Sequence, residues 1–276
     1  MKTGILLAAF GTATPQGEAT LRRFAQRVRD RYPDVPVRWA FTSPAMRERL
    51  AGARKKSDSV GKALRKMAFE RYESIAVQPL HVVPGIEYTD VLDECAAVAS
   101  QFSALAAGAP LLAGGEDMDA LARALLAGLP PSRAAGDAVL FAGHGSRHDS
   151  AAYYAALSRA VTGIDPLAFV ATMKGEVQLH QALPLLLAKG VRHVWLVPLL
   201  AVIGRHALED LAGNRPDSWR TLLEAQGLTC IPVLTGMAEM PCFADVWIDH
   251  LDKALRLLET SDPQPPSHDC HARRIR

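Results

Sequence analysis

The sequence predicts an α/β protein with two similar lobes, each a parallel sheet flanked by helices, and an active-site cleft between them. Short apolar runs alternate with longer segments whose apolar residues recur at helical spacing, which is typical of parallel strands joined by helices. The two halves of the chain also repeat each other in order. A chain of 276 residues is long enough for two lobes of moderate size.

The predicted strands are short apolar runs, four in each half of the chain. In order, they are Gly4–Phe10, Val35–Thr42, Ser74–Leu80, Ala109–Leu112, Ala138–Ala142, Leu167–Thr172, His193–Leu200 and Thr229–Leu234. The segments between them include amphipathic helices. These are Gly17–Asp30, Val60–Tyr72, Ala151–Val161, Glu176–Lys189 and, after the last strand, Pro241–Glu259. Parallel strands need such crossover connections, so the alternation favours a parallel sheet.

The stretch AGLPPSRAAGDA, residues 127–138, is rich in Gly, Pro and Ala and is the expected boundary between the lobes. We therefore expect an N-terminal lobe over residues 1–129 and a C-terminal lobe over residues 130–260. The tail, residues 261–276, has little apolar content, and we expect it to be disordered.

Three segments of the first half correspond to three segments of the second half. AAFGTATP matches AGHGSRHD, AFTSPAMRERL matches AFVATMKGEVQL, and QPLHVVPGIEYTDVL matches VPLLAVIGRHALEDL. In this register Phe10 pairs with His144, and Glu87 pairs with His206. The repeats are alike in scaffold but differ in their ionisable side chains. We therefore expect the chemistry to be placed in one lobe, the C-terminal one.

Composition excludes several classes of protein. A formal net charge of +2 and a pI of about 8.4 are too mild to indicate nucleic-acid binding, and no apolar run approaches the roughly 18 residues of a membrane span. The N-terminal residues lead directly into a predicted strand, and the following GTATPQGE does not resemble a signal-peptide cleavage region, so we expect the cytoplasm. The four cysteines are scattered and form no Cys-x-x-Cys pair, so we expect no disulfide framework. Phosphate-loop and dinucleotide motifs are absent, so we expect no organic cofactor. The sequence leaves a homo-oligomer open.

Ionisable side chains follow three predicted strands of the second half, where loops lead into helices. His144 stands between two glycines, His206 follows the strand that ends near Leu200, and Lys174 and Glu176 follow the strand that ends near Thr172. Ligands of parallel sheets bind beyond the carboxyl ends of the strands. If these strands are neighbours, the side chains converge on one pocket.

Two imidazoles and a carboxylate suit a divalent metal such as cobalt, iron, nickel or zinc. They also suit proton transfer near neutral pH. Metal insertion into a tetrapyrrole needs both, because the pyrrole N–H groups lose two protons while the ion passes to the ring nitrogens. A tight ligand set would trap the ion, so a sparse, open site is expected.

Further candidates could contact the substrate. His81, in QPLHVVPG, lies in the equivalent region of the first lobe, and Phe10 and Glu87 are the counterparts of the two histidines. Basic residues near the predicted cleft could pair with substrate carboxylates, although solvated loop charges are an equally good interpretation of each. These are Arg147, Lys174 and Arg205.

The sequence resembles the anaerobic sirohydrochlorin cobaltochelatases, class II chelatases related in fold to ferrochelatase. The residues that carry the resemblance are LLAAFGT, AFTS, VQPLHVVPGIEY, GAPLL, FAGHGSRH and PLLAVIGRHALEDLAG, with DSW ending at Trp219. The resemblance implies ATP-independent insertion of cobalt(II) into sirohydrochlorin, or its precorrin precursor, in cobalamin biosynthesis. It also implies two α/β lobes with a cleft between them, and His144 and His206 as metal ligands, with His144 also a base.

One position departs from the family pattern. The resemblance implies a glutamate in a Val-Glu-Gly-like stretch, but here TMKG places Lys174 at that point. Glu176 lies two residues further on, and Glu87 of the other lobe is a second candidate for the acidic role. Three alternatives therefore stay open. Two are enzymes on the same or a related tetrapyrrole, a ferrochelatase that inserts iron(II) and a nickel chelatase that inserts nickel(II), and the third is a carrier of tetrapyrrole or metal without turnover. Lys174 is the feature that favours the carrier.

Overall fold

A computed structural model describes the chain over residues 2–112, 118–145, 151–175, 178–259 and 273–275. The contacts within it divide the chain into two compact units, one of residues 1–114 with 241–276 and one of residues 115–240. Each unit contains a sheet of parallel strands covered by helices, which confirms the predicted α/β fold class. The cleft between two lobes stays a prediction.

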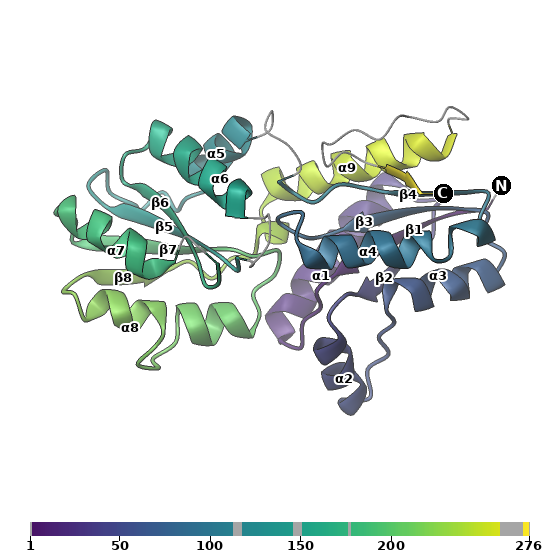
Figure 1. The fold of residues 1–276 in the computed structure, drawn as a ribbon, viewed down its shortest axis with the longest axis horizontal. Coiled ribbons are helices and arrows are strands. Elements are labelled where there is room, and N and C mark those ends of the chain that lie inside the picture. The colour runs from purple at the N-terminus through teal and green to yellow at the C-terminus, as the bar shows by residue number, and fades with distance from the viewer. Residues whose placement is uncertain (1, 113–117, 146–150, 176–177, 260–272, 276) are drawn as a thin grey trace. The chain divides into compact units, whose positions relative to one another are not determined.

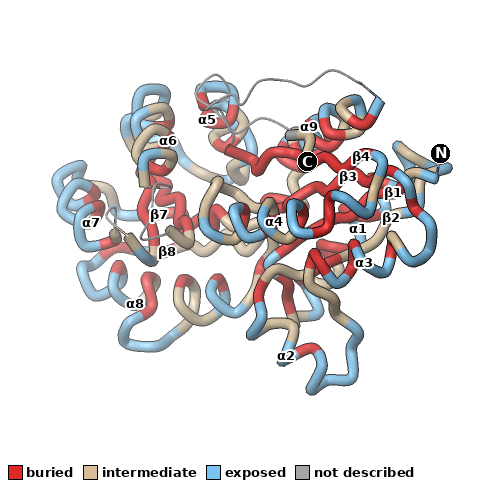
Figure 2. The backbone as a smooth tube through the Cα atoms, turned by 45° about the vertical axis from the view of Figure 1, so that its right-hand side comes forward, coloured by how far each residue is buried: buried red, intermediate tan, exposed pale blue. Residues whose placement is uncertain are grey.

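Within the described residues, the sheet of the first unit has the strand order β2-β1-β3-β4-β9 (Figure 1). Its strands are β1 (Thr3–Ala9), β2 (Val37–Phe41), β3 (Ser74–Pro79), β4 (Ala104–Ala107) and β9 (Arg273–Ile275). The first four are parallel, and β9 pairs antiparallel with β4. β1 and β3 are buried along almost their whole length, as Figure 2 shows, and they form the centre of the unit.

Helices cover both faces of this sheet. The unit contains α1 (Pro15–Arg31), α2 (Pro44–Gly52), α3 (Val60–Phe69), α4 (Ile86–Ala96), the short η1 (Ala99–Gln101) and α9 (Pro241–Glu259). α3 and α4 pack on one face through residues such as Leu64 and Val91. α1 and α9 pack together away from that cluster, where Phe24 meets Trp247 edge to face with ring centroids 6.2 Å apart. Side-chain oxygens at Thr14, Ser43 and Ser59 cap the N-termini of α1, α2 and α3.

The sheet of the second unit has the order β6-β5-β7-β8 among the described residues. Its strands are β5 (Ala138–Gly143), β6 (Ala168–Thr172), β7 (His193–Leu199) and β8 (Thr229–Pro232), all parallel. Its helices are α5 (Met118–Ala127), α6 (Ala151–Ile164), α7 (Leu179–Ala188), the π-helical segment η3 (His206–Leu211), α8 (Trp219–Glu224) and η4 (Met237–Glu239). α7, η3 and α8 share one apolar cluster with the strands, and α6 packs against β6 and α5.

The two sheets repeat the same strand order, which agrees with the repeat in the sequence. Ala8 lies opposite Pro79 in the ladder of β1 with β3, and Ala142 lies opposite Pro198 in the ladder of β5 with β7. The second predicted match, of AFTSPAMRERL with AFVATMKGEVQL, needs a correction. Ala9 pairs with Phe41 and the equivalent Gly143 pairs with Thr172, so Thr172 rather than Phe169 is the counterpart of Phe41.

The fourth strand differs from the expectation. β4 is Ala104–Ala107, whereas the more apolar Ala109–Leu112 is irregular. Pro110 within that run lacks the N–H that a ladder requires, which opposes a strand there. α9 packs against this strand, and the backbone carbonyl of His250 lies 3.2 Å from where a Cβ on Gly108, the residue after β4, would stand.

The division of the chain also differs from the expected boundaries. The structure groups α5 with the second unit, although it precedes the Gly- and Pro-rich stretch, and groups α9 with the first unit, where it contacts β3 and β4. An amphipathic helix can cover either of two similar sheets, so its sequence does not identify its partner. Of the tail expected to be disordered, Arg273–Ile275 form β9. No helix in the described part of the chain combines the length and apolar character needed to cross a bilayer.

Candidate metal centre

His144 directly follows β5, and the packing of its two neighbouring glycines fixes its backbone. A Cβ on Gly143 would collide with the ring of Tyr154 on α6, and a Cβ on Gly145 would collide with the backbone carbonyl of Lys174. Gly145 also has φ +75°, which favours glycine. The amide of Lys174 donates to the carbonyl of His144 at 3.0 Å. The glycines therefore hold the histidine against the end of β6.

His206 begins η3, which follows β7, the neighbour of β5 in the sheet. Its Nδ1 lies 2.5 Å from Oδ2 of Asp210, one turn further along η3. Arg215 donates through Nη2 to the other carboxylate oxygen of Asp210 at 3.0 Å. The carboxylate can only accept from the ring, so Nδ1 carries the proton and Nε2 is left as the ligating nitrogen. π-Helical turns are frequent at functional sites.

The two histidines meet. Their ring centroids are 5.3 Å apart and their planes are inclined by 64°. With metal–nitrogen bonds of about 2.0–2.1 Å, and each ring centre about 1 Å beyond its nitrogen, two imidazoles on one tetrahedral ion have centroids roughly 5 Å apart. The observed spacing is therefore suitable for two ligands of one divalent ion. The Nδ1 of His144 contacts the carbonyl of Gly145 at 3.0 Å, so this ring also carries its proton on Nδ1.

The acidic member of the predicted set lies outside this pair. Glu176 is not among the described residues, and the same holds for Arg147. In the part of the chain that the structure describes, no group of three or more His, Cys, Asp or Glu side chains is arranged to hold a metal ion. Lys174 lies beside His144 through its backbone, and its side chain is exposed. The described centre is thus a pair of imidazoles with an exposed lysine near it.

Arg205, the remaining basic candidate of the second unit, is exposed and adjoins His206. Its Nε donates to Glu209 at 2.7 Å, one turn along η3. Arg215 approaches the same carboxylate at 3.7 Å. Arg205 therefore lies next to the histidine pair, already engaged in a surface ion pair that a stronger acidic ligand could replace.

In the first unit, Phe10, His81 and Glu87 occupy the carboxyl-end edge of the sheet. Phe10 follows β1 and is 40% exposed, which is unusual for a large apolar side chain. His81 follows β3, and Nε2 of its ring lies 3.4 Å from Oγ1 of Thr42. Its Nδ1 is enclosed and has no hydrogen-bond partner among the described residues. Burial lowers the pKa of His81 to about 4, although Glu87 acts in the opposite direction, so this ring is neutral near pH 7.

Asp210 and Arg215 were not among the predicted site residues. The available signal is the spacing of Asp210, four residues after His206, because residues one turn apart lie on the same face of a helix. Arg215 gives no such signal, since it lies in the loop after η3 and reaches Asp210 only through the fold.

The sequence has clear relatives. Residues 3–256 match the family model described as cobalt chelatase (CbiK). The chain is 55% identical over 260 residues to the sirohydrochlorin cobaltochelatase CbiKC of Nitratidesulfovibrio vulgaris, covering 94% of this chain and 92% of the relative. It is 31% identical to the sirohydrochlorin cobaltochelatase of Salmonella typhimurium, covering 93% and 98%.

Solved structures support the fold independently. The chain superposes on SirB from Bacillus subtilis with Fe³⁺ at a TM-score of 0.63 and 15% identity, covering 92% of this chain and 96% of the other. It superposes on the sirohydrochlorin chelatase SirB of Bacillus subtilis subspecies spizizenii in complex with cobalt at a TM-score of 0.62 and 15% identity, covering 98% and 100%. At this identity the likeness shows the two-lobed α/β fold alone.

Proposed function

The chain belongs to the cobalt chelatase (CbiK) family, and we propose that it inserts cobalt(II) into sirohydrochlorin without a nucleotide or organic cofactor. The structural observation that carries this proposal is the pair His144 and His206, whose rings are spaced for one divalent ion. The name of the 55% identical relative, a sirohydrochlorin cobaltochelatase, supports cobalt as the metal and sirohydrochlorin as the ring. The scattered cysteines favour a reducing compartment, and we propose the cytoplasm.

Both histidines bind the incoming ion through Nε2. Their Nδ1–H groups are held by the carbonyl of Gly145 and the carboxylate of Asp210. Two neutral ligands add no charge and leave the other coordination positions to solvent and substrate, so the ion stays exchangeable. A closed set of four protein ligands is typical of structural metal sites, which retain their ions.

During transfer of the ion to the ring, each new bond from a ring nitrogen to the ion replaces a bond from the ion to an imidazole or a water. Two pyrrole N–H protons leave the ring, so that a divalent ion replaces two protons. Once its bond to the ion has broken, Nε2 of His144 is a free imidazole nitrogen, a kind of base that works near neutral pH, and it accepts a pyrrole proton and passes it to solvent.

The acidic role has two candidates. Glu176 lies close in sequence to Lys174, and Glu87 is the counterpart of His206 in the repeat. A carboxylate near the ion would strengthen its binding and take up the second proton. A protonated lysine in the same place would weaken binding of a cation. Lys174 is therefore the residue that we expect to tune metal affinity.

The substrate-binding set combines apolar and basic side chains. Phe10, being exposed, offers an apolar surface to the ring, and His81 offers a neutral imidazole. Arg147, Lys174 and Arg205 are proposed to bind carboxylates of the substrate. Glu87 belongs to this set if Glu176 fills the acidic role.

The test is the absorbance change of sirohydrochlorin with cobalt(II), followed anaerobically with and without the protein. Iron(II) and nickel(II) are run in parallel, and His144→Ala, Lys174→Glu, Glu87→Gln and Glu176→Gln are compared with the parent. We expect a protein-dependent rate that is highest with cobalt and is lost in His144→Ala with the fold intact. Whichever glutamine variant slows insertion identifies the acidic residue.

Two results would contradict the proposal. A rate at background with every metal, together with tight binding of the ring, would identify a carrier. A rate highest with iron(II) or nickel(II) would keep the chelatase and change its metal.

A further inference from the structure

The first unit contains an element that the second unit lacks at the same place in the repeat. Between β2 and α3 the chain forms α2 and a loop, whereas the equivalent connection from β6 to α7 spans only residues 173–178. α2 buries only Leu50 and extends away from the sheet in both Figure 1 and Figure 2. A helix that packs so little of itself contributes little to the core, so its presence needs another explanation.

The segment around this element has a large excess of positive over negative charge. Residues 46–67 contain eight Lys and Arg and two acidic residues, a formal charge of +6. The whole chain carries +2, so the remaining residues together carry −4. The charge is therefore concentrated on α2, the following loop and α3, which favours attraction of an anion to this place.

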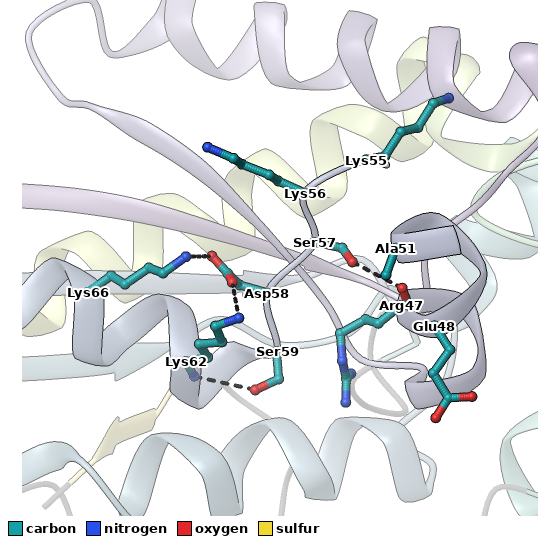
Figure 3. Close-up of a pocket in the computed structure, with 10 residues that line it drawn as sticks. All are labelled: Arg47, Glu48, Ala51, Lys55, Lys56, Ser57, Asp58, Ser59, Lys62 and Lys66. Carbon is teal, nitrogen blue, oxygen red and sulfur yellow. Dashed lines mark hydrogen bonds and ion pairs between the residues drawn. The ribbon is translucent and has the colours of Figure 1, made fainter. Parts of the chain in front are cut away.

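A hollow of about 670 Å³ lies between α2, the loop and α3, and Figure 3 shows its lining. Five cationic and two acidic side chains line it, with Ala51, Ser57 and Ser59. The charged residues are Arg47, Glu48, Lys55, Lys56, Asp58, Lys62 and Lys66. Its walls thus retain a formal excess of three positive charges.

Part of this charge is neutralised inside the hollow. Asp58 accepts from Lys66 at 2.5 Å and lies 3.1 Å from Lys62. Burial of Asp58 would raise its pKa, but the two lysines outweigh burial and hold the pKa below its ordinary value. Asp58 therefore stays ionised, and these three side chains fix the loop against α3.

Two cations are left for a ligand. Lys56 makes no ion pair with any residue that the structure describes. Arg47 donates through Nη1 to the backbone carbonyls of Phe41 at 2.6 Å and Thr42 at 2.8 Å. These bonds hold the guanidinium in place without neutralising it, so Arg47 is ordered before any ligand arrives.

The hollow adjoins an apolar edge of the same unit. Arg47 binds the carbonyls at the carboxyl end of β2, and the amide of Ser43 there donates to the carbonyl of Phe10 at 3.3 Å. Phe10, which is 40% exposed, is therefore joined through its backbone to the strand end that Arg47 binds, at the edge where parallel sheets bind ligands. An apolar surface next to a cluster of cations matches a flat apolar ring with carboxylates on its periphery.

We propose that the hollow between α2 and α3 is an anchoring site for the peripheral carboxylates of the tetrapyrrole, with Lys56 and Arg47 as the binding cations. This inference rests on the proposed function, because it takes the ring from there. It adds a binding site for the carboxylates of the substrate, which the neutral histidine pair does not bind. The ring itself is too large for the hollow to enclose and would place only its acidic edge there.

The test measures binding of metal-free sirohydrochlorin by quenching of its fluorescence. Lys56→Glu is compared with Lys56→Gln and with Lys253→Glu, which makes the same charge change on an exposed lysine of α9 outside the hollow. We expect Lys56→Glu to weaken binding about five- to tenfold, Lys56→Gln less, and Lys253→Glu less than twofold. The loss should shrink at high salt and should be smaller for a porphyrin with two carboxylates.

Insertion of cobalt by the parent protein is measured on the same preparation. Equal dissociation constants for Lys56→Glu and Lys253→Glu, with insertion by the parent intact, would overturn the anchoring site and leave the proposed function standing. Equal losses for the acidic ring and the porphyrin with two carboxylates would also overturn it. Failure of the parent to insert any metal would contradict the proposed function instead.

Discussion

The two units share one sheet order but carry different side chains at the same strand ends. Where β5 ends in His144, β1 ends in Phe10, and where η3 begins with His206, α4 has Glu87. The difference extends one turn further, since the counterpart of Asp210 is Val91, which is fully buried in the core of the first unit. The proposed metal ligands and the carboxylate beside His206 are thus in the second unit, and the equivalent positions of the first unit hold Phe10, Glu87 and a core valine.

Backbone features are retained where the side chains differ. Both strand ends are followed by a glycine with positive φ, Gly11 at +101° and Gly145 at +75°. Both third strands place a proline, Pro79 or Pro198, opposite an alanine. The geometry that presents a side chain at the strand end is therefore common to both units, and under the proposed function the identity of that side chain decides whether the end binds a metal. Each prediction below changes one member of such a pair.

The largest effect is expected when the second unit is given the residue of the first. His144→Phe removes a ligand and a base while keeping a large ring that the Phe10 strand end accommodates. We expect cobalt insertion to fall more than about 100-fold, because both metal binding and proton transfer are lost. The anaerobic absorbance assay measures the rate, and circular dichroism checks the fold. A rate in His144→Phe equal to that of the parent protein would contradict the assignment.

The two glycines offer a sharper comparison of the strand ends. In Gly145→Ala the new methyl meets the backbone carbonyl of Lys174, which cannot rotate away, whereas in Gly11→Ala it meets the flexible side chain of Met46, with Cγ at 2.8 Å. We expect Gly145→Ala to lose about 2–3 kcal/mol in the free energy of unfolding, and Gly11→Ala about half as much. Urea unfolding measures both. Equal losses would mean that positive φ alone, and not the contact with Lys174, sets the cost.

The sequence predicted what depends on local pattern and missed what depends on partners. The apolar runs located seven strands within a few residues, and strand ends identified His144 and His206 as a pair. The prediction of a strand at Ala109–Leu112 was wrong because the apolar character of the run was weighted above Pro110. The actual strand, β4, is the less apolar Ala104–Ala107, against which α9 packs. The sequence also did not predict that α9 packs on the sheet of the first unit, because its apolar face could cover either sheet.

Within the site, the same division holds. His206 was predicted from its place after a strand, but its partner Asp210 needed the helical register of η3, and Arg215 needed the folded loop. The buried ring of His81 could not be distinguished from an exposed one by sequence, because the enclosure of Nδ1 comes from surrounding elements. Comparing the two halves of the sequence identifies candidate site residues such as His206, but it does not identify the residues that hold them in place.

Asp210 tests whether the support of His206 matters to the metal. Asp210→Asn keeps the size of the side chain but removes the charge that holds Nδ1–H, and we expect cobalt(II) to bind about 10- to 100-fold more weakly. Titration of the protein with cobalt(II) alone, followed by its visible absorption, gives the dissociation constant without turnover. Glu209→Gln is the matched control, since Glu209 pairs with Arg205 and not with the ring. Equal affinities in the two variants would show that Asp210 only contributes to the surface network with Arg215.

The smallest effect is expected at His81, because this histidine can change its charge with pH and its counterpart in the second unit, Leu200, cannot. His81 corresponds to Leu200 in the repeat, and burial lowers the pKa of the His81 ring to about 4 from its ordinary 6.5. The unfolded chain binds a proton at His81 below pH 6.5 and the folded chain does not until about pH 4, so stability falls as pH falls through this window. Above pH 6.5 the ring is neutral in both states and has no such effect.

His81→Leu, which copies the second unit, should remove this dependence. Because part of the residue is accessible although Nδ1 is enclosed, we expect a contribution of about 1–2 kcal/mol rather than the full difference in pKa. Urea unfolding at pH 7 and pH 4.5 should therefore show the parent losing that much more than the variant. Parallel losses in the two proteins would mean that the ring is hydrated enough to titrate normally. In that case the ring of His81 would be accessible to a cation. The two units would then differ less in their capacity to bind a metal than their side chains indicate.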